Sequence, residues 1–145
     1  MYLNILFLSV WALFGCSREI DPIDYGKDQC AHCRMTIVDN KFGAEIVSSK
    51  GKVHKFDAAE CMVNFLNTGK ISEADTETLL VTNIESPGNF IDARTAVFLI
   101  SPKLRSPMGE NISAYDSRNS AEKYKEKYPG DVYEWNSLVA MFKSR

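Results

Sequence analysis

The segment "KVHKFDAAECMVNFL", residues 52–66, decides the fold because it contains a strand, a turn into a helix, and the helix itself. Its first five residues alternate in the manner of a half-buried strand ending at Phe56. Asp57 then has the residue type of a helix N-cap. The apolar residues that follow recur at i, i+3, i+4, i+7 and i+8, which is the spacing of one helix face. Those residues are Ala58, Cys61, Met62, Phe65 and Leu66. Gly69 is the expected residue just beyond the helix end.

Outward from this segment, the same order of elements occurs twice. Residues 43–47 and 52–56 predict a hairpin ahead of the first helix. Residues 95–100 and 112–115 predict two strands ahead of a second helix, capped by Asp116 or Ser117. A strand over 79–84 lies between the units, and a last strand over 131–138 leads into a short helix over 137–142. We therefore expect an α+β fold, with two ββα-type units and mainly antiparallel strands.

The N-terminal segment differs from the rest of the chain. Residues 1–15 carry no charged side chain and have the length of a secretory hydrophobic region, which predicts a lipoprotein signal peptide. The cysteine after Gly15 is then the lipidated residue, Cys16. Residues 16–28 are expected to form a flexible tether, and residues 29–145 a single domain.

The charge balance gives no reason to expect a nucleic-acid partner. The 145-residue chain has a net charge of −2. A nucleic-acid-binding domain normally carries a basic surface. We also find no Ser-His-Asp arrangement, no pair of acid/base carboxylates and no phosphate-cradling glycine loop, so the chain is not expected to be an enzyme.

With Cys16 set aside as the lipidation site, three cysteines remain: Cys30, Cys33 and Cys61. An odd number does not make a complete disulfide framework in an exported protein. Cys61 and Met62 lie on the apolar face of the first helix and are expected in the core. Cys30 and Cys33 form a C-x-x-C pair, which is compatible with a zinc site, a redox dithiol, a disulfide or a copper site.

Copper(I) prefers thiolate and thioether ligands. The residues after Cys33 resemble a strand, and on an extended strand Cys33 and Met35 project from the same face. Met108 lies in the polar turn "SPMGEN" and is the candidate third ligand. Cys30 and His32 are further candidates. The predicted metal ligands are thus Cys33, Met35 and Met108, with Cys30 and His32 in addition.

The chain also resembles a known family. The stretches "CAHCRMTIVDNKFGAEI", "KVHKFDAAECMVNFL", "SPMGENISAYDS" and "PGDVYEW" are similar to those of the NosL family, over nearly the whole chain after Cys16. The family's Cys-Gly-Met corresponds to Cys33-Arg34-Met35, and its Met-Gly to Met108-Gly109. The sequence departs from the pattern at Arg34, where the family usually has glycine, and at Cys30.

The resemblance implies a lipid-anchored copper(I) chaperone, facing the periplasm in the cell envelope of a bacterium. Its expected partner is a copper-receiving enzyme, namely nitrous oxide reductase or its assembly factors. A homodimer, the choice between inner and outer membrane, and the full ligand set stay open. Two alternatives are kept: a periplasmic thiol-disulfide protein using Cys30 and Cys33, and a lipoprotein binding module with structural zinc.

Overall fold

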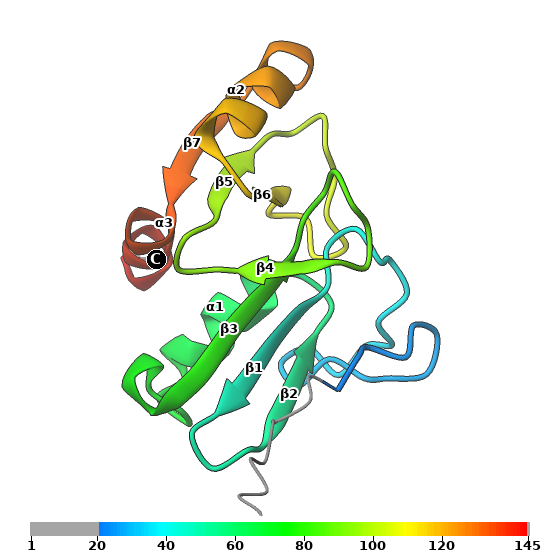
Figure 1. Cartoon of the computed structure of the whole chain (residues 1–145), viewed down its shortest axis with the longest axis vertical. Helices are drawn as coiled ribbons and strands as arrows, with labels where there is room; N and C mark the ends of the chain where they lie inside the picture. Colours follow the sequence, from blue (N-terminus) through cyan, green and yellow to red (C-terminus); the bar gives the residue numbers. More distant parts are fainter. Residues whose placement is uncertain (1–20, 145) are drawn as a thin grey trace, which may run out of the picture.

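The computed structural model describes residues 21–144, so the expected signal peptide and Cys16 lie outside the described residues. Two antiparallel sheets form the framework (Figure 1). The first has the order β2-β1-β3-β4 and the second the order β6-β5-β7. The strands are β1 (Ala44–Ser48), β2 (Val53–Phe56), β3 (Thr76–Thr82), β4 (Phe90–Asp92), β5 (Val97–Ile100), β6 (Ile112–Tyr115) and β7 (Asp131–Glu134). The α+β class and the antiparallel strands expected from sequence are confirmed.

Three helices complete the fold: α1 (Ala59–Asn67), α2 (Arg118–Lys127) and α3 (Trp135–Lys143), with a short 3₁₀ turn, η1 (Glu73–Asp75). Helix α1 follows the β1–β2 hairpin, and α2 follows the β5–β6 pair, so both ββα units are present (Figure 1). None of the helices within residues 21–144 has the length and hydrophobicity that a membrane span requires.

The first helix begins one residue later than expected. Its N-cap is Ala58, which has no side chain able to cap, so the prediction for Asp57 is wrong. The sequence offered Asp116 or Ser117 as the cap of α2. Ser117 is the cap, because its side chain accepts a hydrogen bond from the Ser120 N–H. Gly69 follows the α1 C-cap with φ of +72°, a left-handed conformation that suits glycine.

Several other boundaries differ from the predictions: β3 spans residues 76–82 where 79–84 was expected, and β5 begins at Val97. The last strand ends at Glu134, and the chain turns helical at Trp135, because the apolar residues from there on recur at helical spacing and are buried against α1 and β5. At the other end, Ile23 is buried in the main core. Packing of the domain therefore begins ahead of residue 29, and the predicted tether does not extend to residue 28.

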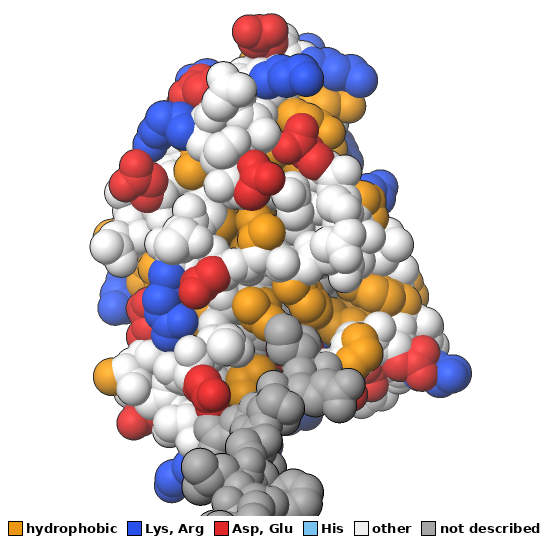
Figure 2. Space-filling model, viewed as in Figure 1, with side chains coloured by type: hydrophobic (Ala, Val, Ile, Leu, Met, Phe, Trp, Pro, Cys, Tyr) orange, Lys and Arg blue, Asp and Glu red, His pale blue; other side chains and the backbone are white. Residues whose placement is uncertain are grey.

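The two sheets are joined into one framework. Asn83, just after β3, forms a parallel bridge with Ala114 of β6, and the Ile84 N–H donates to the Ala114 carbonyl at 3.0 Å. The main core contains residues of both sheets together with α1 and α3. Acidic and basic side chains are interspersed on the face shown in Figure 2, with hydrophobic side chains between them. Cys61 lies on α1, and the segment that contains Cys30 and Cys33 is hydrogen-bonded to β2 of the first sheet.

Candidate metal centre

The segment around Cys30 and Cys33 is a tight turn and not a strand. The Cys30 N–H donates to the Met35 carbonyl at 2.8 Å, and the Arg34 N–H donates to the Cys30 carbonyl at 3.0 Å. Arg34 has φ of +68°, in the left-handed region. The predicted extended strand through Cys33 and Met35 is therefore wrong: the β-branched residues that suggested it begin only after the turn. The left-handed conformation explains why glycine suits position 34.

Backbone hydrogen bonds fix this turn against the first ββα unit. The Ala31 N–H donates to the Lys55 carbonyl of β2 at 2.8 Å. An isolated antiparallel bridge joins Gln29 and Thr36, which closes the base of the turn. The carboxylate of Asp57, at the β2–α1 junction, accepts the backbone N–H of Val38. The turn is thus held beside the start of α1.

This packing brings three thiols together. The sulfur atoms of Cys30, Cys33 and Cys61 all lie within 4.8 Å of one another, and the three cysteines are free. Three sulfurs bound to one ion at about 2.3 Å would be about 4 Å apart. Cys30 and Cys61 are buried, whereas Cys33 is half-buried. The group is therefore almost preassembled for a single soft metal ion, with access through Cys33.

Cys61 was expected only as a core residue. It is indeed buried in the core, but its sulfur also completes the thiol group. The pKa of Cys61 is raised, so its position in the first turn of α1 was no sequence signal for a thiolate ligand. Its apolar spacing on the helix concealed that role.

The protons are unevenly shared among the thiols. The pKa of Cys30 is lowered to about 4, first because it accepts a hydrogen bond from the Cys61 thiol, and further because backbone N–H groups of Asp57, Cys33 and His32 point at its sulfur. The pKa of Cys61 is raised, chiefly by the hydrogen bond that it donates to Cys30. Burial raises the pKa of Cys33. At neutral pH, one thiolate and two thiols therefore occupy the site.

Two buried residues shortly before Cys61, Asp57 and Glu60, carry carboxyl groups. Burial raises the pKa of Asp57, and the charge on Cys30 raises it further. Burial also raises the pKa of Glu60, which accepts a hydrogen bond from the Ser106 hydroxyl. Both shifts favour the neutral carboxyl, and a neutral carboxyl near the thiols opposes their ionisation less than a carboxylate does.

The methionines predicted as ligands lie at the surface. Met35 is 55% exposed and Met108 is 38% exposed. The backbone N–H of Met35 donates to the Cys33 sulfur, so Met35 directly follows the turn that holds that thiol. Met108 belongs to a loop that Ser106 attaches to Glu60, the residue before Cys61. Both exposed thioethers thus belong to segments fastened to the thiol group.

The imidazole of His32 is not part of the thiol group. His32 is exposed, and its contribution to the site is the backbone N–H that points at Cys30. Within residues 21–144, no fourth His, Cys, Asp or Glu side chain joins the three thiols. Structural zinc sites are almost always four-coordinate, whereas soft thiolate ligands also suit copper(I).

Comparison with known proteins agrees with this architecture. A family model described as NosL matches residues 23–141. The chain belongs to the NosL family. The crystal structure of the copper chaperone NosL from Shewanella denitrificans has the same fold, with a TM-score of 0.69 and 24% sequence identity, covering 82% of this chain and 94% of that chain. No curated protein matches. This NosL-family chain thus combines the family fold with a three-thiol group at the start of α1.

Proposed function

We propose that this protein is a copper(I) chaperone, anchored by a lipid at Cys16, that faces the periplasm and delivers copper to a recipient enzyme. The observation that carries the proposal is the convergence of three free thiol sulfurs within 4.8 Å, one of them half-buried. Copper(I) is the cargo and is favoured by this all-sulfur donor set. Membership of the NosL family supports nitrous oxide reductase, or its assembly factors, as the recipient.

A carrier must release its cargo as well as bind it. Cys30 and Cys61 are buried and would hold the ion from the protein side, whereas Cys33 lies where an incoming ligand can replace it. The exposed thioethers of Met35 and Met108 are placed on segments attached to this group. We infer that they take part in transfer, as weaker ligands that are exchanged while copper passes to or from a partner.

An anaerobic titration of the reduced full chain with copper(I), in competition with a chromogenic chelator, tests this proposal. We expect one ion per chain, with tight binding abolished in Cys33→Ser. Met35→Leu and Met108→Leu should weaken binding or speed loss to the chelator, whereas Met141→Leu, a partly buried core position, is the matched control. If Cys33→Ser binds copper(I) like the wild type, or if zinc is bound in its place, the proposal is wrong.

The dithiol alternative has one observation in its favour, the pKa of about 4 at Cys30. However, Cys30 is buried, and an attacking thiolate must reach a disulfide in solution. The more accessible Cys33 has a raised pKa and so carries little thiolate at neutral pH. Measurement of disulfide exchange in metal-free protein separates the two functions, since a chaperone should show negligible turnover.

A further inference from the structure

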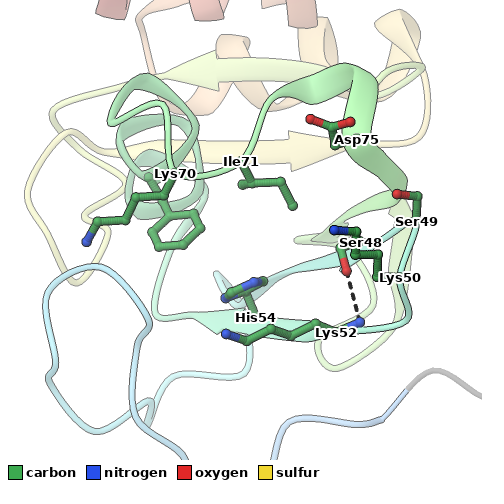
Figure 3. Close-up of a pocket in the computed structure, with 9 residues that line it drawn as sticks. Ser48, Ser49, Lys50, Lys52, His54, Lys70, Ile71 and Asp75 are labelled. Atoms are coloured by element: carbon green, nitrogen blue, oxygen red, sulfur yellow. Dashed lines mark hydrogen bonds between the residues drawn. The ribbon is translucent and has the colours of Figure 1, made fainter.

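A second concave site lies beside the turn of the β1–β2 hairpin. It is a cavity of about 430 Å³, and none of the three cysteines lines it (Figure 3). Its walls come from the hairpin turn, from β2, and from the segment between α1 and η1. Because these segments are separate in sequence, the fold itself creates the cavity.

The charge of this cavity is opposite to that of the whole chain. Lys50, Lys52 and Lys70 line it, together with a single carboxylate from Asp75. That carboxylate already accepts a hydrogen bond from the Ser72 hydroxyl at 2.6 Å. The ion pairs of the described residues do not include any of the three lysines. A lining with net positive charge, in a chain of net charge −2, favours an anion and disfavours a cation.

The cavity also offers neutral polar groups and an apolar wall. His54 of β2 lines it, and its ring packs against Phe65 at a centroid distance of 5.0 Å (Figure 3). Burial lowers the pKa of His54, and Lys52 lowers it further, so the ring is neutral at pH 7 and can donate one hydrogen bond. The Ser48 hydroxyl accepts the Lys52 backbone N–H at 2.9 Å, which leaves its own hydrogen for a ligand. Phe65 and Ile71 supply the apolar side.

We propose that this cavity binds a phosphate group, carried either by a small soluble phosphate ester or by a phospholipid headgroup. Lysine ammonium groups are common phosphate ligands, and a phosphate has acceptor oxygens for the lysines, the serine and the imidazole together. The cavity is larger than a phosphate ion, and its apolar wall suits the organic part of an ester. The proposal does not depend on the copper chemistry, because no thiol lines the cavity.

Calorimetric titration of the full, metal-free chain with glycerol 3-phosphate at low ionic strength tests the site. In the variant Lys50→Gln/Lys52→Gln, the affinity should fall about tenfold, since two exposed charge contacts are lost. The variant Lys103→Gln/Lys125→Gln changes the net charge equally, outside the cavity, and should stay within about twofold of the wild type. Unchanged copper(I) binding in all variants verifies that they are folded.

Two short-chain lipids distinguish the source of the phosphate. Dihexanoyl phosphatidylglycerol and dihexanoyl phosphatidylcholine have the same acyl chains, so a difference in affinity reports the headgroup. Tighter binding of the phosphatidylglycerol than of glycerol 3-phosphate assigns the site to a membrane lipid, and the reverse order assigns it to a soluble ester. The proposal is overturned if neither glycerol 3-phosphate nor dihexanoyl phosphatidylglycerol binds at millimolar concentration. It is also overturned if the two double variants lose affinity equally.

Discussion

At Phe56-Asp57-Ala58 and at Tyr115-Asp116-Ser117 a strand passes into a helix through an aspartate, but the two junctions are built differently. The second has a serine cap, and of the described helical residues that follow, only Ala121 is buried. The first has no side-chain cap, and six of its helical residues are buried. Three residues after the N-cap, the second junction has Ser120, whereas the first junction has Cys61. The second junction is built for stability, whereas the first accepts an uncapped helix start and places a thiol there.

The half of the chain ahead of β4 and the half from β4 onward also differ in how well their buried polar groups are hydrogen-bonded. Among the described residues, the buried side-chain atoms without a hydrogen-bond partner belong to Tyr25, Glu45, Asp57, Glu60 and Thr78, all ahead of β4. In the second half, Ser101 and Ser113 donate to backbone carbonyls. Unsatisfied buried groups cost stability and often mark functional regions. The unsatisfied groups thus occur in the part of the chain ahead of β4, which also holds the three thiols.

Among variants of the two junctions, the largest expected effect is the loss of copper(I) affinity in Cys61→Ser. We expect a fall of about 1,000-fold or more, because removing a direct ligand should exceed the 10–100-fold cost of losing an outer-shell partner. Ser120→Ala, at the equivalent position of the second junction, should leave the affinity unchanged. Competition titrations measure both. Equal affinities for wild type and Cys61→Ser would show that the buried thiol is only a packing residue.

The next effect is the pH dependence of copper binding, which should come from the thiols of the cysteine turn and of the first junction. Cys33 and Cys61 have raised pKa values and hold protons near neutral pH, and copper(I) must displace those protons. Two protons released per ion make the association constant rise about 100-fold per pH unit. Chelator competition between about pH 6 and pH 8 gives the slope. A slope near zero would mean that the thiols are already ionised in the metal-free protein.

These effects also indicate how far sequence reasoning extends. The hairpin, the cap at Ser117 and the end of α1 at Gly69 were predictable because local residue types determine them. The role of Cys61 was not, because it depends on the Ala31–Lys55 hydrogen bond, a tertiary contact without a local pattern. The turn at Arg34 was missed for a related reason: a left-handed arginine is uncommon, and the β-branched residues after it suggested a strand.

A third test concerns Glu45, which should make the free energy of unfolding depend on pH through the half of the chain ahead of β4. It is fully buried on β1, and burial raises its pKa to about 7. A carboxyl with a raised folded-state pKa stabilises the fold below its unfolded pKa, and that stabilisation is lost as pH rises toward 7. Between about pH 4.5 and pH 8, the wild type should lose about 3 kcal/mol relative to Glu45→Gln.

Urea denaturation of both proteins across this pH range measures that difference. Glu126→Gln, at an exposed position of α2, is the matched control and should follow the wild type at every pH. If the free energy of unfolding of Glu45→Gln shows the same slope with pH as the wild type, another group of the first half is responsible.

The smallest effect tests the second junction directly. Ser117→Ala removes the side-chain hydrogen bond that caps α2, and should lower the free energy of unfolding by about 1 kcal/mol. Ser117→Asn should largely retain stability, because asparagine also caps helices. Copper(I) affinity should be the same in all three proteins. A change in affinity would contradict the separation of roles between the two junctions.

Lys55 of β2 contacts both the first described residues of the chain and the turn that holds Cys30 and Cys33. Its ammonium group contacts Asp21 at 3.0 Å, the Pro22 carbonyl at 3.0 Å and Asp28 at 2.8 Å, while its backbone carbonyl holds Ala31. A force applied to the chain ahead of Asp21 is therefore transmitted into the middle of a hydrogen-bonded strand before it reaches the cysteine turn. Because the same residue holds Ala31, Lys55 connects the segment that begins at Asp21 both to the sheet and to the cysteine turn.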